Sequence, residues 1–147
     1  MMKIAPAVTE ELPALTALER ECFADPLPED MLVRQLTDPM RVFLRAEEDG
    51  HLLGAADFQF VLDEGYIGNV AVTAPARRRG VGRALVEALL EEGRKRGLAF
   101  LTLEVRRSNA PARALYESCG FEIVGVRRNY YEKPAEDAVL MTKMLPY

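Results

Sequence analysis

A short segment rich in arginine and glycine constrains this chain more than any other feature. Residues 77–83 read RRRGVGR, follow an apolar run at 70–72 and precede the clearest amphipathic pattern of the sequence. That pattern starts near Gly82, recurs at helical spacing and ends at Gly97, so it predicts a helix. We therefore expect a buried strand, a glycine-containing loop and a helix in direct succession.

This loop has the composition of an anion-binding site. Glycines lack a Cβ and let the backbone approach a ligand, while loop N–H groups and the start of the helix attract negative charge. With the added charge of the arginines, a diphosphate is the ligand that fits best. Arg83 and Ala84 exclude a Walker loop, and Leu85 argues against a dinucleotide-binding fingerprint. A solvated basic loop without a ligand is the alternative.

The other periodic patterns predict a mixed α/β or α+β domain. We expect strands at 3–7, 41–46, 52–61, 66–72, 100–105, 121–127 and 138–144. We expect helices capped by Thr9, opened by Pro28, started near Gly82 and capped by Asn109. Helices interleaved with a mixed sheet give three layers, and the lack of repeats or linkers predicts one domain over 1–147.

The composition argues against several classes of protein. A net charge of −4 disfavours a general nucleic-acid binder. One histidine and no CxxC pair predict that no metal is bound, and we expect Cys22 and Cys119 to be reduced, buried thiols. No apolar run is long enough to cross a bilayer, and the first residues lack the apolar core of a signal peptide. We expect a cytoplasmic protein.

Several motifs, in the same order along the chain, resemble the GNAT superfamily of N-acetyltransferases. The residues NVAV at 69–72, Pro75 and the glycine loop resemble its acetyl-CoA signature. The second half of the resemblance consists of LEVR at 103–106, SN at 108–109, ALYES at 114–118 and GF at 120–121. The residues RRNYY at 127–131 narrow it to the RimI-type ribosomal-protein-alanine N-acetyltransferases. The resemblance extends from about residue 61 to residue 144.

The resemblance implies the GNAT fold, a mixed and mostly antiparallel sheet that is splayed between its fourth and fifth strands and flanked by helices. It also implies that acetyl-CoA is the co-substrate, with its pantetheine arm between the splayed strands and its diphosphate on the glycine loop. The residues implied for co-substrate binding are Val70, Ala71, Val72, Arg77, Arg78, Arg79, Gly80, Val81, Gly82, Arg83 and Asn109.

The resemblance implies that Glu104 is the general base that deprotonates the attacking amine. An α-amino group has a pKa of about 8, so the base has modest work to do at neutral pH. Glu104 shares a strand face with Phe100 and Thr102, which allows it to project into a pocket. A strand-end carboxylate that lies in solvent or pairs with an arginine is the alternative.

By the same resemblance, Tyr116 is the general acid that protonates the departing thiolate. Its alternative role is packing, since Ala112, Tyr116 and Cys119 lie at helical spacing. We expect Leu115 to make the main inward contact, which leaves Tyr116 free to face the co-substrate.

Four residues are implied on the acceptor side, namely Leu27, Glu64, Tyr130 and Tyr131. Leu27 stands where similar enzymes often carry Trp, and Pro28 follows it, so the peptide preference is open. Glu64 either adds negative potential or only closes a hairpin turn. Tyr130 and Tyr131 are expected in the connection between the last two strands, where they border the peptide groove or cover the end of the sheet.

The function implied is acetyl transfer to a protein N-terminal α-amine, with the N-terminal alanine of a small-subunit ribosomal protein as the expected acceptor. Other protein N-termini, lysines or small amines are the alternative acceptors. A non-catalytic acyl-CoA-binding module is a rival of another class, and retention of Glu104 and Tyr116 argues against it. A monomer and a weak dimer both remain open.

Overall fold

A seven-stranded mixed sheet forms the centre of the molecule, with the strand order β1-β2-β3-β4-β5-β7-β6. The computed structural model describes residues 1–145, and residues 146 and 147 of the predicted domain lie outside that part. The strands are β1 (Lys3–Pro6), β2 (Arg41–Glu48), β3 (His51–Val61), β4 (Glu64–Val72), β5 (Phe100–Arg106), β6 (Glu122–Glu132) and β7 (Ala135–Met144). The helices are α1 (Leu12–Cys22), α2 (Glu29–Thr37), α3 (Val81–Lys95) and α4 (Ala110–Ser118), with 3-10 turns η1 (Thr9–Glu11) and η2 (Ala74–Ala76). The predicted order of strands and helices is confirmed.

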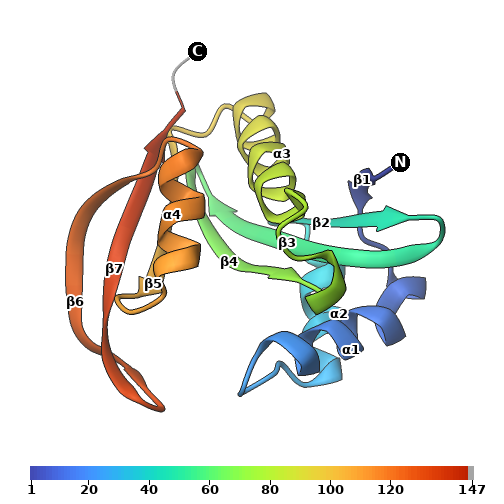
Figure 1. Ribbon diagram of the computed structural model, residues 1–147. Coiled ribbons are helices and arrows are strands. Elements are labelled where there is room, and N and C mark those ends of the chain that lie inside the picture. The colour runs from blue at the N-terminus through green and yellow to red at the C-terminus, as the bar shows by residue number, and fades with distance from the viewer. Residues whose placement is uncertain (146–147) are drawn as a thin grey trace.

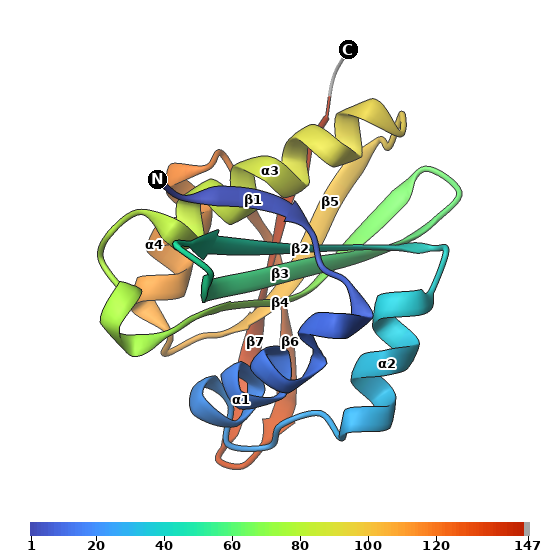
Figure 2. The ribbon, with the colours of Figure 1, turned by 90° about the vertical axis from the view of Figure 1, so that its right-hand side faces the viewer.

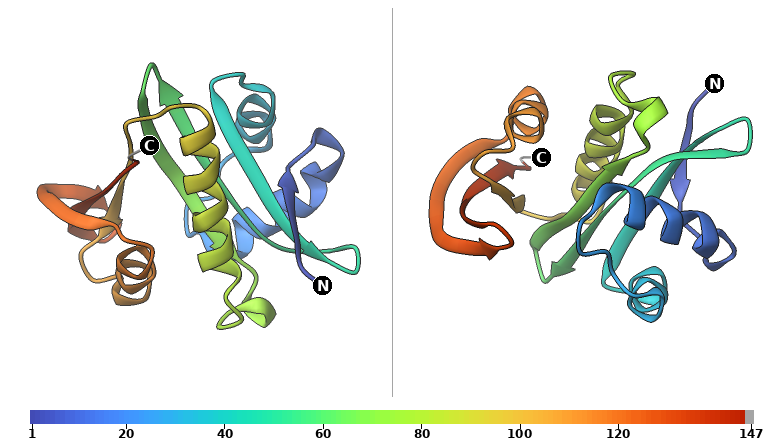
Figure 3. Two further views of the ribbon diagram at one scale, coloured as in Figure 1. Left: turned by 90° about the horizontal axis from the view of Figure 1, so that it is seen from above. Right: turned by 60° about the horizontal axis from the view of Figure 1, so that its bottom comes forward.

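Helices cover both faces of the sheet (Figures 2 and 3). On one face, α3 packs on β2, β3 and β4, and the larger apolar core gathers Val42, Phe58 and Leu85 there. On the other face, α1 packs on β3 and β4, where Leu15 and Leu18 meet small alanine side chains. The three predicted layers are therefore present, with the sheet between two layers of helices. Strands β3 and β4 bury side chains on both faces.

The sheet opens between β4 and β5, which are parallel neighbours over only three residue pairs. These pairs run from Glu64↔Phe100 to Tyr66↔Thr102. Beyond them, β4 stays with β3 while β5 continues its antiparallel ladder with β7. Figure 1 shows the resulting two halves, with β5, β6, β7 and α4 on one side and β1 to β4 on the other. The predicted splay between the fourth and fifth strands is confirmed.

α3 positions the glycine loop at the edge of this opening. The loop reaches the helix through Gly80, whose φ of 81° is a conformation that residues with a Cβ rarely adopt. Val81, Leu85 and Leu89 are buried along the helix face that packs on the sheet. Burial of each such side chain contributes about 1.5–3 kcal/mol, so packing holds the loop where the helix begins.

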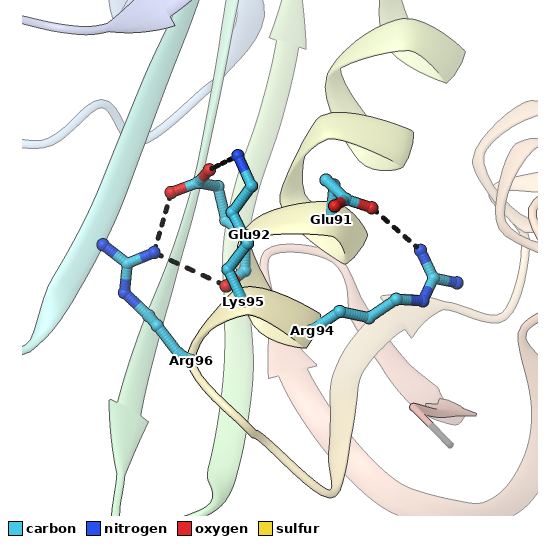
Figure 4. Close-up of polar contacts among 5 residues, drawn as sticks. All are labelled: Glu91, Glu92, Arg94, Lys95 and Arg96. Atoms are coloured by element: carbon cyan, nitrogen blue, oxygen red, sulfur yellow. Dashed lines mark hydrogen bonds and ion pairs between the residues drawn. The ribbon is translucent and has the colours of Figure 1, made fainter. Parts of the chain in front are cut away.

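A network of ion pairs closes the far end of α3 (Figure 4). Glu92 accepts from Arg96 at 2.7 Å and from Lys95 at 3.4 Å, while Arg94 lies 3.7 Å from Glu91. The hydrogen bond from Arg96 is the main cause that lowers the pKa of Glu92 below its ordinary value. Cations at a helix C-terminus also interact favourably with the helix dipole.

Local predictions differ from the structure at several places. Thr9 was expected to cap α1, but it lies in η1, and the residue directly before α1 is Glu11, whose carboxylate accepts the N–H of Val8 at 3.0 Å. Cys22 and Cys119 are free thiols but only half-buried. β6 is longer than predicted, which has consequences for the acceptor side of the site.

Candidate active site

A cleft of about 800 Å³ lies beside the part of β4 that has separated from β5. Its walls are the end of β4, the glycine loop, the start of α3 and the inner side of α4. All residues predicted to hold the co-substrate line this cleft, except Arg79. A volume of this order is typical of a small-molecule site.

β4 turns backbone hydrogen-bonding groups toward the cleft at Val70 and Val72. Thr73 N–H donates to Leu53 O at 2.8 Å, so the backbone of Thr73 faces β3. Strand residues alternate in the side to which their N–H and C=O point, so those of Val72 and Val70 point away from β3. In agreement, Val72 O accepts from Cys22 Sγ at 3.4 Å and from Arg77 Nε at 3.1 Å, and both residues line the cleft.

The glycine loop combines positive φ angles with exposed arginines. Arg78 has a φ of 64° and Gly80 one of 81°, so the loop folds tightly ahead of α3. A Cβ on Gly82 would lie 3.3 Å from Leu115 Cδ2, a tight contact between α3 and α4. The missing side chain of Gly82 thus brings the two helices close at the mouth of the cleft.

The arginines of the loop differ in where they point. Arg79 turns away from the cleft and its Nη2 donates to Glu48 Oε1 at 2.8 Å. That hydrogen bond is the main cause that lowers the pKa of Glu48. Arg83 lines the cleft and reaches Glu87 at 3.1 Å and Ser118 O at 3.4 Å. The charges facing the cleft are therefore those of Arg77, Arg78 and Arg83.

α4 brings Asn109 and Tyr116 to the cleft. The Asn109 side chain accepts the N–H of Ala112 at 3.2 Å, so the predicted cap is confirmed. Tyr116 lines the cleft, and its ring packs edge-on against Phe121 with centroids 5.6 Å apart. It is more buried than Leu115, contrary to the expected division between the two residues. Burial raises the pKa of Tyr116, which keeps the phenol protonated as a donor.

Glu104 lies on the opposite face of β5 from α4. Its neighbours Leu103 and Val105 belong to the core beneath α3 and α4, so the alternation of the strand directs Glu104 to the other side. There its Oε1 pairs with Arg127 Nε at 3.2 Å, and Glu104 is not among the residues that line the cleft. The two residues with predicted proton roles thus lie on opposite faces of the sheet, and only Tyr116 lines the cleft.

Two of the four predicted acceptor residues, Tyr130 and Tyr131, lie side by side. Tyr130 and Tyr131 lie in β6, not in the connection as predicted, because β6 runs to Glu132. Their rings meet edge-on at 5.0 Å, and the guanidinium of Arg106 lies 4.3 Å from the Tyr131 ring. Tyr131 is half-buried; burial first, and nearby charges including Glu104 after it, raise its pKa.

Leu27 and Glu64 lie far apart along the molecule. The N–H of Leu27 donates to the buried Glu19 carboxylate at 3.1 Å, which ties the connection between α1 and α2 to α1. That connection and the β6–β7 hairpin lie at the same end of the molecule in Figure 1. Glu64 instead begins β4 at its paired end, where it accepts from the Tyr66 phenol at 2.6 Å, and it does not line the cleft.

Sequence reasoning missed Cys22 and Phe23, which line the cleft from the end of α1. They lie a few residues before Leu27 in the sequence, and this proximity to a predicted site residue was the signal that could have identified them. Among residues 1–145, no group of three or more His, Cys, Asp or Glu could hold a metal ion. No helix in the same part of the chain is long and apolar enough to cross a membrane.

A sheet splayed at parallel strands, with a glycine loop and a helix N-terminus facing the opening, is the architecture of one class of acyl transferases. The chain belongs to the acetyltransferase (GNAT) family, whose model matches residues 12–121. The fold and the family therefore agree.

Named relatives narrow the likeness within this family. The chain is 41% identical over 143 residues to the [ribosomal protein bS18]-alanine N-acetyltransferase of Escherichia coli K12, with 96% of each chain covered. It is 33% identical to the putative [ribosomal protein bS18]-alanine N-acetyltransferase of Bacillus subtilis, with 90% of this chain and 88% of the other covered. The crystal structure of the ribosomal-protein-S18-alanine N-acetyltransferase from E. coli superposes with a TM-score of 0.92 at 39% identity, covering 100% of this chain and 96% of that one.

Proposed function

We propose that this chain transfers the acetyl group of acetyl-CoA to the α-amine of an N-terminal alanine on a small-subunit ribosomal protein, bS18 by analogy with its named relatives. The observation that carries the proposal is the cleft between the parted strands, which opens directly onto the glycine loop of α3. The proposed acceptor is supported by the named relatives, because the match covers 96% of the Escherichia coli enzyme in sequence and 96% of it in structure. The proposed reaction takes place in the cytoplasm.

The co-substrate lies along β4 with its diphosphate at the start of α3. Val70 and Val72 hold the pantetheine arm through the backbone groups that face away from β3. Loop N–H groups from Gly80 to Gly82 and the positive end of the helix bind the diphosphate. Arg78 and Arg83 add charge, and Asn109 contacts the co-substrate from α4. Arg79 stays with Glu48 and acts indirectly by holding the loop.

In the reaction the amine nitrogen forms a bond to the thioester carbonyl carbon, and the carbon–sulfur bond breaks. Glu104 takes a proton from the nitrogen on one face of the sheet. Tyr116, reaching the opening from α4, gives its proton to the departing sulfur. The products are the N-acetylated protein and free coenzyme A. An acid or base in this position contributes roughly 10²–10⁴ in rate.

The acceptor enters on the face of the sheet that carries Glu104 and α1. The connection around Leu27 and the aromatic pair Tyr130 and Tyr131 flank its path, since both segments lie at one end of the molecule (Figure 1). Burial, the neighbouring Tyr130 and the Glu104 carboxylate raise the pKa of Tyr131, so its phenol stays protonated beside the path of the acceptor.

A peptide panel tests the proposal. Acetyl-CoA is mixed with a peptide that begins with the N-terminal alanine sequence of bS18, with the same peptide blocked at its α-amine, with a lysine peptide and with a polyamine. Thiol release and the mass of each product are followed. We expect acetyl transfer to the free alanine peptide alone.

Transfer to lysine or polyamine in preference to the alanine peptide would replace the proposed acceptor by that amine. Coenzyme A binding by calorimetry, with no thiol release on any amine, would instead make the chain a non-catalytic acyl-CoA-binding module. Either result contradicts the proposed activity and leaves the family assignment in place.

A further inference from the structure

A buried aspartate lies beside the point where β4 leaves β5. Asp57 is 2% exposed and forms an ion pair with Arg41 of the neighbouring strand β2. Its Oδ1 also accepts the backbone N–H of Asn69 on β4 at 3.1 Å. Arg41 Nη2 in turn donates a hydrogen bond to Gln59 Oε1 at 3.2 Å. Asp57 therefore links three strands on the face of the sheet where α1 packs.

The link falls on a β-bulge in β4. Ala56 pairs with Val70 and Phe58 pairs with Ile67, so two residues of β4 stand opposite Asp57 alone. Ile67 and Val70 both pack against the core beneath α3, although residues three apart in a regular strand face opposite sides. A bulge leaves one backbone group of the longer strand without a ladder partner. The Asp57 carboxylate replaces that partner for the N–H of Asn69.

The bulge decides which residues of β4 serve the opening. One extra residue reverses the alternation of everything that follows it in the strand. Because of the bulge, Val70 and Val72 point their backbone groups away from β3 and Ala71 packs against α1. Without it, β4 would present the other set of residues to the opening.

Gly68 makes this arrangement possible. An ideal Cβ built on Gly68 would lie 2.6 Å from Asp57 Oδ2, closer than any real contact of that kind. The carboxylate thus occupies the space that a side chain at Gly68 would take. The glycine, the aspartate and the arginine act as one unit, which we call the bulge clamp (Arg41, Asp57 and Gly68).

We propose that Asp57 is a positioning residue for acetyl transfer: it fixes the bulge so that the N–H of Val70 is aimed at the thioester carbonyl. The inference rests on the proposed function, because it concerns the same opening. Asp57 touches no substrate and acts through the β4 backbone. Its effect is therefore on polarisation of the carbonyl and on kcat, while binding of the diphosphate at the separate glycine loop is independent of it.

The test compares Asp57→Ala with wild type in two measurements that do not need the natural acceptor. Isotope-edited infrared spectra of acetyl-CoA labelled at the carbonyl report its polarisation, and calorimetry reports the affinity for coenzyme A. We expect Asp57→Ala to lose the shift of the carbonyl band and to keep its affinity for coenzyme A. We also expect kcat to fall about 10²-fold, as on loss of one oxyanion donor.

Two further variants separate positioning from general structure. The double variant Arg41→Gln with Asp57→Asn removes both charges but keeps an oxygen for the Asn69 N–H, so we expect the carbonyl shift and kcat to be retained. Gly68→Ala displaces the carboxylate from the other side and should reproduce the Asp57→Ala spectrum. It carries the test if Asp57→Ala fails to fold.

An unchanged carbonyl band in Asp57→Ala, or in Gly68→Ala if that variant is used, would overturn the proposal. The proposal would also be overturned if the double variant lost the carbonyl shift to the same extent as Asp57→Ala. The effect would then come from loss of the buried charges and not from loss of the hydrogen bond to the N–H of Asn69. A wild-type enzyme that polarises the carbonyl but ignores alanine peptides would contradict the proposed acceptor and leave the role of Asp57 standing.

Discussion

Arg127 Nε lies 3.2 Å from Glu104 Oε1, across the face of the sheet opposite α4. The arginine side chain is 57% exposed and the glutamate side chain 30%, so the pair contributes only about 0–1 kcal/mol to stability. Its main consequence is orientation: the carboxylate is held by the strand that also carries Tyr130 and Tyr131. The sequence left open whether Glu104 pairs with an arginine, and the structure shows that it does.

Replacement of Glu104 tests its role as base. We predict that Glu104→Gln lowers kcat by roughly 10²-fold near pH 7. The rate should recover as pH rises through about 8, where an α-amine loses its proton without help. Steady-state rates across this range check the prediction, with Glu122→Gln, an exposed glutamate on β6, as the matched control. A loss that stays constant with pH would remove Glu104 from proton transfer.

Tyr116→Phe tests the general acid. Only the hydroxyl is removed, so the ring should keep its contact with Phe121 and the affinity for coenzyme A should not change. We predict a fall in kcat of roughly 10²–10⁴. Because burial raises the pKa of Tyr116, the phenol stays protonated through the neutral and mildly alkaline range, and wild-type activity should show no loss there from its ionisation.

Tyr66→Phe is the control for that experiment, since its phenol is exposed and bonds to Glu64 at the paired end of β4. It should turn over like wild type. Equal rates for Tyr116→Phe and Tyr66→Phe would show that Tyr116 only packs.

Glu19 makes a prediction about pH and stability. Burial is the main cause that raises its pKa, against the opposing hydrogen bond from the N–H of Leu27. The folded state therefore binds the proton more tightly than the unfolded chain, and this group's contribution to stability declines as pH rises from about 4 through the raised pKa. Glu19→Gln keeps an oxygen that can accept the N–H of Leu27. Because glutamine does not ionise, the variant does not lose stability as pH rises.

We predict that Glu19→Gln matches wild type in Tm near pH 4 and exceeds it near pH 7. Thermal unfolding at several pH values measures the difference, with Glu10→Gln, an exposed residue of η1, as the control. A variant whose Tm falls relative to wild type as pH rises would contradict the direction of the shift.

The packing of α3 gives a prediction of magnitude. Leu85 is fully buried against the sheet. We predict that Leu85→Ala lowers the free energy of unfolding by about 2–5 kcal/mol. Leu62→Ala, at a position 86% exposed, should change it by less than about 0.5 kcal/mol. Urea denaturation measures both, and similar losses for the two variants would contradict the assigned core.

The sequence predicted those parts of the molecule that local patterns determine. The helical repeat from Val81 to Leu89 and the cap at Asn109 depend on residues a few positions apart. The motifs of the family placed the opening between β4 and β5, and the cleft gathers nearly all the residues predicted for the co-substrate.

What the sequence did not predict depends on contacts between distant segments. Arg79 turns to Glu48, 31 positions away, and the bulge clamp joins Arg41 to Asp57 across two strands. In β6 the register shifts again after Arg127, where Asp137 of β7 accepts the N–H of Asn129 at 2.9 Å. Strand register of this kind is fixed by pairing with a partner strand, so periodicity within one strand cannot reveal it.

Mass spectrometry of small-subunit ribosomal proteins, from cells with and without the gene for this chain, tests the proposed activity most directly. We predict that one protein beginning with alanine carries an N-terminal acetyl group only when the gene is present. The group should return with the wild-type gene and not with one encoding Tyr116→Phe. If every N-terminal acetyl group on these proteins persists without the gene, the ribosomal acceptor is wrong.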